Sequence, residues 1–203
     1  MIAPVLAPSW LTARPIAHRG LHDKTNGRIE NSASAARAAA EGGFAIECDV
    51  QPSADGEAMV FHDFKLERLT GQSGAVKDRS AAELAATALS GSTDRIPTLP
   101  DFLALIGGRV PLVVEIKSAF DGDMRLARRT AEIVAARNAP IAIKSFDPDV
   151  IAHLHENGAA LGLAATPLGI LSFGFAVTAA RAAAMLDAWR AAGALDAARV
   201  SLG

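Results

Sequence analysis

Short apolar runs alternate with Ala-rich helical segments along most of the chain, and this alternation restricts the fold more than any other feature. Continuous apolar runs are typical of strands buried on both faces of a parallel sheet that helices cover. The sequence therefore predicts an α/β fold. The clearest expected strands are residues 15–18, 44–50, 58–61, 111–117 and 141–146.

Helix signals stand between these strands. Asn31 or Ser32 is expected to cap a helix over 34–41, and Ser80 with Glu83 forms a capping box. The other expected helices cover residues 98–107, 123–137 and 147–156. A loop at 166–174 and a helix at 177–192 are expected between two weaker strands, at 161–164 and 199–202. No stretch resembles a linker, so residues 1–203 are expected to form a single domain.

Composition excludes several classes of protein. The formal charge is -2 over 203 residues, which leaves no basic footprint for a nucleic-acid partner. The single Cys is compatible with a reducing compartment. Residues 1–12 lack the basic start of a signal peptide, and no apolar run of about 20 residues predicts a transmembrane segment. We therefore expect a cytoplasmic protein without a nucleic-acid partner.

Two acids interrupt the apolar strand 44–50. Glu47 and Asp49 are two residues apart, so they share one face of the strand, while Cys48 faces the opposite side as a small core residue. Two carboxylates on a buried face repel each other and lose hydration, which is unfavourable without a compensating cation. The pair is read either as a strand end with solvated acids or as half of a hard-metal site.

Polar residues at the ends of other strands favour the second interpretation. His18 ends the first strand, His62 the third, and Glu115 lies near the end of the fourth. The chain has neither a Gly-x-Gly-x-x-Gly nucleotide fingerprint nor a Gly-Lys-Ser/Thr phosphate loop. Polar residues at several strand ends favour a closed β/α barrel over an open doubly wound sheet, because a barrel's active site collects residues from many strands.

The residue types at these ends suit one chemistry. The carboxylates Glu47, Asp49 and Glu115 would form an oxygen-rich site for Mg²⁺ or Ca²⁺. His18 and His62 could serve as acid and base, because histidine titrates near neutral pH. The cations Arg19 and Lys117 suit an anionic phosphate ester. Lys144 and Asp147 flank the end of the fifth strand, where helix capping accounts for Asp147.

An ordered set of motifs over residues 14–150 resembles the glycerophosphodiester phosphodiesterase family. Their order is more specific than any one of them, since His-Arg-Gly alone is a weak signal. The matching segments are Ile16-Ala17-His18-Arg19-Gly20, Glu30-Asn31-Ser32, Glu47-Cys48-Asp49-Val50, Phe61-His62-Asp63, Leu69-Thr70-Gly71, Ile96-Pro97-Thr98-Leu99, Glu115-Ile116-Lys117 and Ser145-Phe146-Asp147.

The resemblance implies a TIM barrel with a small insertion after the third strand, at about residues 65–96. It implies a divalent cation, Mg²⁺ or Ca²⁺, on Glu47, Asp49 and Glu115, with Asn31 assisting. It implies His18 and His62 as the catalytic pair. Arg19, Lys117 and Glu30 are expected to bind the substrate, a glycerophosphodiester that is hydrolysed to glycerol 3-phosphate and an alcohol.

The resemblance fades beyond about residue 165, and six to seven of eight strands can be recognised. The sequence thus predicts a barrel that is incomplete at its C-terminus, with unpaired edge strands through which the chain could self-associate. Two alternatives follow: an impaired or non-catalytic barrel that binds metal or phosphate, and a related phospholipase-type phosphodiesterase.

Overall fold

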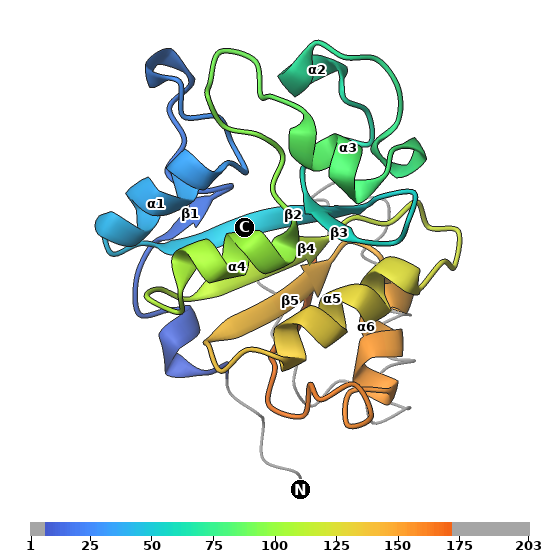
Figure 1. Cartoon of the computed structure of the whole chain (residues 1–203). Coiled ribbons are helices and arrows are strands. Elements are labelled where there is room, and N and C mark those ends of the chain that lie inside the picture. The colour runs from blue at the N-terminus through green and yellow to red at the C-terminus, as the bar shows by residue number, and fades with distance from the viewer. Residues whose placement is uncertain (1–6, 172–203) are drawn as a thin grey trace, which may run out of the picture.

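One mixed sheet organises the molecule in the computed structural model, which describes residues 7–171 (Figure 1). Five strands run parallel in the order β1-β2-β4-β5-β6, and β3 pairs with β2. The bounds are β1 Ile16–His18, β2 Ala45–Pro52, β3 Ala58–Val60, β4 Leu112–Ile116, β5 Ile141–Ser145 and β6 Leu168–Ile170. Within the described residues β1 and β6 are the two outer strands, so the architecture is a β/α barrel that is not closed.

The third strand does not join the parallel set as the alternation predicted. β3 runs antiparallel to β2, with Val60 opposite Val50. The cause is the short connection, since a parallel return requires a crossover of a dozen or more residues and only a turn with Gly56 at a φ of 85° separates the two strands. The reversal carries the chain back along β2 from Pro52 toward Asp49, and Phe61 N–H donates to the Asp49 carbonyl at 3.0 Å.

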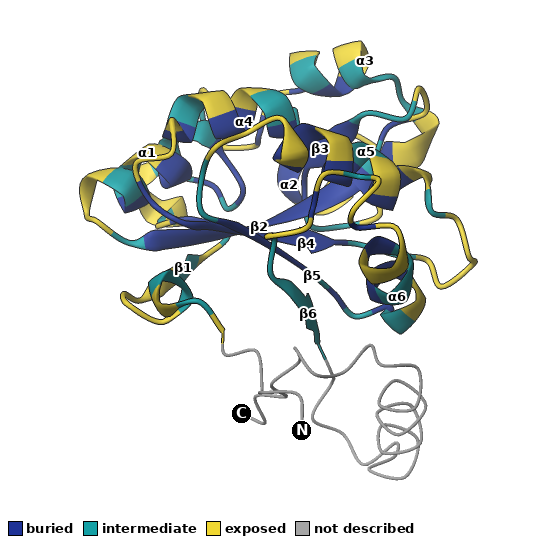
Figure 2. Ribbon diagram, turned by 90° about the horizontal axis from the view of Figure 1, so that it is seen from below, coloured by how far each residue is buried: buried dark blue, intermediate teal, exposed yellow. Residues whose placement is uncertain are grey.

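Helices cover one face of the sheet and bury its apolar side chains. Ile46, Cys48 and Val50 of β2 lie in this core. Figure 2 shows the buried strands against helices whose outer turns are exposed. The larger helices are α1 Ala33–Glu41, α4 Leu99–Ile106, α5 Arg125–Ala135 and α6 Pro148–Glu156. Alternation along β2 therefore places Glu47 and Asp49 on the face opposite this core.

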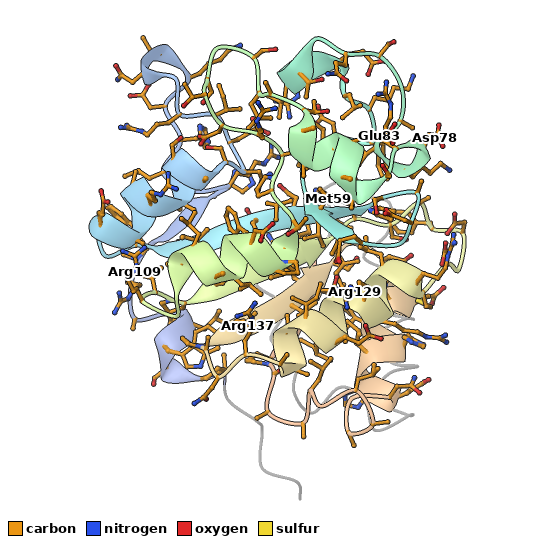
Figure 3. The ribbon with its side chains drawn as sticks, viewed as in Figure 1. Met59, Asp78, Glu83, Arg109, Arg129 and Arg137 are labelled. Atoms are coloured by element: carbon orange, nitrogen blue, oxygen red, sulfur yellow. The ribbon has the colours of Figure 1, made fainter. Side chains whose placement is uncertain are left out.

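The expected helix starts are confirmed. The side chains of Ser32, Ser80, Thr98 and Asp147 each accept a backbone N–H in the first turn of α1, α3 (Ala81–Ala86), α4 and α6. Polar contacts then fix the helices in place. Arg129 of α5 pairs with Glu57 beside β3 at 2.8 Å, and Arg137 donates to a carbonyl in α4 at 3.4 Å. Both arginines are labelled in Figure 3.

The predicted insertion has a hydrophobic cluster of its own. Leu66, Leu69, Val76, Leu84 and Leu89 pack together there with Met59 and Ile96. Its short helices are α2 Glu67–Thr70, η3 Val76–Asp78 and α3 Ala81–Ala86. In Figure 1 the segment lies beyond the ends of the strands, on the side where β2 and β4 terminate.

The sixth strand was predicted at the wrong position. Residues 161–164 form turns, and the strand lies instead at β6, inside the expected loop 166–174. Gly162 has a φ of 74°, which is incompatible with an extended strand. The expected helix 177–192 and strand 199–202 lie outside the described residues. Among residues 7–171 there is no helix with the length and apolar character needed to cross a bilayer.

Candidate metal-binding and catalytic site

Three buried carboxylates converge at the carboxyl ends of two neighbouring parallel strands. Asp49 of β2 is the register partner of Glu115 of β4, and Glu47 lies two residues earlier on the same face. One oxygen from each side chain lies within 4.8 Å of the others. The residues are 3%, 1% and 4% exposed for Glu47, Asp49 and Glu115. The sheet register thus brings together the three acids predicted as metal ligands.

Three cationic side chains neutralise this triad. The Lys117 ammonium pairs with Asp49 at 2.8 Å and also contacts Glu115. Arg19 places Nε 3.4 Å from an Asp49 oxygen, and its backbone N–H donates to Glu47 at 3.0 Å. Lys144 of β5 lies 3.0 Å from Glu47 Oε1 and 3.3 Å from Glu115 Oε2. Burial disfavours the charge on Lys144, but attraction to Glu47 and then Glu115 prevails and raises its pKa.

Asn31 is held against the triad from both ends of its amide. Its Nδ2 donates to Asp49 Oδ2 at 2.8 Å, and its Oδ1 accepts the Asp49 backbone N–H at 3.2 Å. Asn31 and Arg19 have φ values of 57° and 60°, a left-handed conformation that non-glycine residues seldom adopt. The Asn31 N–H donates to the Arg19 carbonyl at 2.9 Å, so the two strained residues support each other beside the acids.

The two predicted catalytic histidines both reach this region. His18 is the register partner of Glu47, and its Nε2 lies 3.9 Å from Glu47 Oε2. Its side chain is 66% exposed, so it is accessible to a solute. His62 lines a cavity of about 400 Å³ together with Asp63, Phe64, Lys65 and Lys117. Lys117 therefore connects the wall that carries His62 to the acid triad.

Asp63 fixes the orientation of His62. Its Oδ1 lies 2.6 Å from His62 Nδ1. Hydrogen bonds from Arg68, and secondarily from His62, lower the pKa of Asp63 to about 2 in spite of burial. Asp63 is consequently an acceptor at neutral pH, so His62 donates its Nδ1–H to it and leaves the Nε2 side of the ring facing away from this carboxylate.

Glu30 joins the insertion to the β1 loop. Arg19 Nη1 donates to Glu30 at 2.8 Å, and Arg68 of α2 donates to both Glu30 oxygens at 2.8 and 3.0 Å. Burial opposes the charge on Glu30, but the hydrogen bonds from Arg68 and Arg19 outweigh it and lower its pKa to about 2. Glu30, predicted to bind substrate, thus contacts the predicted phosphate-binding residue Arg19.

Three residues of this site had no assigned role in the sequence interpretation. The sequence pattern indicates only a strand-end position for Lys144 and motif membership for Asp63, and it gives no signal for Arg68. The His62-Asp63 pairing could have been suspected from adjacency, because an acid beside a histidine commonly orients it. Lys144 could not, because its contact with Glu115 depends on the register between β4 and β5.

The donor set fits a hard divalent cation. Oxygen ligands from several carboxylates and an amide are those that Mg²⁺ and Ca²⁺ prefer. The Asn31 amide already bonds Asp49, and three buried negative charges within 4.8 Å require positive charge beside them. The described residues could therefore hold such an ion.

Comparison with known proteins gives the family. The family model described as "Glycerophosphoryl diester phosphodiesterase family" matches residues 18–200. The chain belongs to this family. A glycerophosphodiester phosphodiesterase of Caldanaerobacter subterraneus is 41% identical over 110 residues, which are 51% of this chain and 44% of that protein. The Mycobacterium tuberculosis protein named probable glycerophosphodiester phosphodiesterase 2 is 38% identical over 56% of this chain and 43% of its own length.

A solved structure supports the fold. The phosphodiesterase of Oleispira antarctica, described in complex with the product sn-glycerol-3-phosphate, aligns with a TM-score of 0.71 at 20% identity. The alignment covers 95% of this chain and 87% of that one. The matches to the two curated relatives, in contrast, span less than half of the length of either.

Proposed function

We propose that the protein hydrolyses glycerophosphodiesters to glycerol 3-phosphate and an alcohol in a reaction that depends on a divalent cation. Family membership supports the reaction class. The observation that carries the proposal is the buried triad of Glu47, Asp49 and Glu115, whose oxygens lie within 4.8 Å of one another. Two histidines and the cations Arg19 and Lys117 lie around it. Such a set neutralises a phosphodiester and supplies proton transfer in one place.

The cation would be Mg²⁺ or Ca²⁺, held by Glu47, Asp49 and Glu115 with Asn31 assisting. When bound, it would stabilise negative charge on the phosphoryl oxygens. Arg19 and Lys117 bind the phosphate, and both approach the triad from the side of the strand ends. Glu30 contributes to substrate binding by holding the Arg19 guanidinium in place.

His62 and His18 carry the protons. His62 Nε2 is free to accept a proton from the attacking hydroxyl, because Asp63 holds Nδ1–H. His18 gives a proton to the leaving alcohol as its P–O bond breaks. With the glycerol 2-hydroxyl as the attacking group the first product is a cyclic phosphate, and water then opens it to glycerol 3-phosphate with the two proton transfers reversed. The exposed position of His18 suits exchange of its proton with solvent.

Alanine variants of the histidines test these roles. His18→Ala and His62→Ala are each expected to lower kcat by about 10²–10⁴-fold, the usual contribution of general acid–base catalysis. His153→Ala, on α6 and away from the triad, is the matched control and should leave kcat unchanged. Near wild-type rates in both His18→Ala and His62→Ala would refute the assignment.

A substrate panel separates this function from its alternatives. Phe64 is 53% exposed and lines the same cavity as His62, which would also suit an apolar chain of a lysophospholipid. Release of choline is therefore measured from glycerophosphocholine and from lysophosphatidylcholine. Preference for the first supports the proposal, and preference for the second supports a phospholipase-type enzyme. Cation binding with no release from either supports a non-catalytic barrel.

A further inference from the structure

Lys144 is a partly buried cation that the proposed reaction does not use. It lies on β5, directly opposite Glu115 on β4. Its ammonium is 3.3 Å from Glu115 Oε2 and 3.0 Å from Glu47 Oε1, so it bridges two acids of the triad that come from different strands. The side chain is 20% exposed, against 13% for Lys117.

The charged groups around the triad show how the Lys144 ammonium would affect a bound cation. The three acids carry three negative charges, and Lys117, Lys144 and Arg19 carry three positive charges. Arg19 is shared with Glu30, to which its Nη1 donates at 2.8 Å, so Lys117 and Lys144 are the two ammonium groups whose ion pairs go to the triad itself. A divalent cation bound by Glu47 and Glu115 would lie within a few ångströms of the Lys144 ammonium, which contacts both acids. The two positive charges would repel each other at that distance.

We propose that Lys144 is a tethered competitor for the divalent-cation site, and that an ion binds the triad only when the Lys144 ammonium is displaced from Glu47 and Glu115. This deepens the proposed function, because it concerns the cation that the reaction requires. Lys144 thus sets how tightly the site binds its ion. Lys117 differs from it, since Lys117 contacts Asp49 and Glu115 from the side of the substrate cavity.

The surroundings of Lys144 allow such a displacement. Its neighbour in register on β6 is Gly169, which carries no side chain. A Cβ at Gly169 would lie 3.8 Å from the Lys144 Cβ, so this side of the lysine stem is free of a neighbouring side chain in the strand pair. Glu47 Oε1 has no well-aligned hydrogen bond, although the ammonium is 3.0 Å away. The contact is an ion pair on a flexible four-carbon stem, which can rotate away.

Calorimetric titration of Ca²⁺ and of Mg²⁺ into chelator-treated protein tests the competition. Lys144→Gln removes the competing charge, so it is expected to bind the ion at least tenfold more tightly than wild type. Lys144→Arg keeps the charge and should stay within about threefold of wild type. Lys77→Gln removes an exposed lysine of the insertion and is the matched control for net charge. Its affinity should equal that of wild type.

Thermal unfolding gives a second readout that does not depend on turnover. Without an ion, Lys144→Gln leaves two buried acids short of positive charge, so its melting temperature should fall below that of wild type and Ca²⁺ should restore it. If the variant does not fold in chelator, a Ca²⁺ refolding titration followed by circular dichroism measures the same affinity. Failure to fold at any Ca²⁺ concentration, while Lys144→Arg folds, would overturn the proposal.

An affinity of Lys144→Gln equal to or weaker than that of wild type would also overturn it. Different results would refute the competition by Lys144 and the proposed hydrolytic function. A protein that hydrolyses no phosphodiester but binds the ion more tightly after Lys144→Gln would refute the function alone. An active enzyme whose ion affinity does not respond to Lys144→Gln would refute the competition alone.

Discussion

Replacing Arg68 by Gln removes the link between the insertion and the catalytic loops. Arg68 donates to both Glu30 oxygens and to both Asp63 oxygens, at distances between 2.5 and 3.0 Å. The side chains of Glu30 and Asp63 are 14% and 23% exposed, whereas that of Arg68 is 47% exposed. The pKa of each acid is about 2, and Arg68 supplies a hydrogen bond to both.

These pKa values set the size of the effect. Glu30 falls from an ordinary pKa of 4.5 to about 2, and each pKa unit is worth about 1.4 kcal/mol, which gives a ceiling of about 3 kcal/mol for this acid. Asp63 falls from 3.8 to about 2, which gives a ceiling of about 2 kcal/mol more. Arg19 provides part of the stabilisation of Glu30, and solvent screens the half-exposed Arg68. We therefore expect Arg68→Gln to lower the free energy of unfolding by about 2 kcal/mol at neutral pH. That lies between the ~0.2–1 kcal/mol of an exposed ion pair and the ~3–5 kcal/mol of a buried one.

The effect should disappear in acid. An acid whose folded pKa is lowered stabilises the protein above its unfolded pKa, and this stabilisation is lost as the pH falls through the folded pKa. The difference between wild type and Arg68→Gln should be constant above about pH 5, shrink from about pH 4.5 downward and be gone below about pH 2. Urea unfolding followed by circular dichroism at several pH values measures it.

The control is the Arg125–Asp123 ion pair, in which the acid has a similar pKa but the arginine is far more exposed to solvent. The hydrogen bond from Arg125 lowers the pKa of Asp123 to about 2, yet Arg125 is 81% exposed. Arg125→Gln should therefore cause no measurable loss of stability. The reasoning is refuted if Arg68→Gln is no more destabilising than Arg125→Gln, or if its effect persists unchanged to pH 2.

Three further predictions concern single residues. Asp63→Asn replaces the carboxylate, which only accepts, by a neutral amide that can also donate, so His62 Nδ1–H is no longer held firmly. We expect kcat to fall by about 10²-fold with little change in KM in steady-state assays, and an equal loss through KM would contradict this. Gly20→Ala should lower the free energy of unfolding by about 2 kcal/mol in urea titrations. Gly20 has a φ of 81°, and the new Cβ would lie 3.0 Å from Ala35. Unchanged stability would contradict this close approach of Gly20 to α1. Cys48 is fully buried, and burial raises its pKa, so a thiol reagent should react only after unfolding; rapid labelling of native protein would be inconsistent with its place in the core.

The convergence of the acids could be predicted because it depends on local rules. The two-residue spacing of Glu47 and Asp49 places them on one face of any strand. Parallel strands then bring Glu115 to the same edge, whichever strand lies between them in sequence. Helix caps such as Ser80 and Asp147 were equally local, since each bonds a backbone group within three residues.

The remainder of the site depends on long-range geometry. Lys144 enters the triad through the register of β4 against β5, which no sequence pattern fixes. Arg68 reaches Glu30 across 38 residues through the packing of the insertion. The direction of β3 and the true position of β6 were missed because short apolar runs specify neither strand direction nor the turn that precedes them.

Release of glycerol 3-phosphate from glycerophosphocholine by the purified protein, with added Mg²⁺ or Ca²⁺ and again after chelation, tests the central claim most directly. Wild type should release product with the ion and lose activity in chelator, with recovery on adding the ion back. Glu115→Gln should remain inactive in both conditions, because one of the three carboxylates within 4.8 Å is gone. Release that continues unchanged in chelator, or in Glu115→Gln, would contradict a metal-dependent triad.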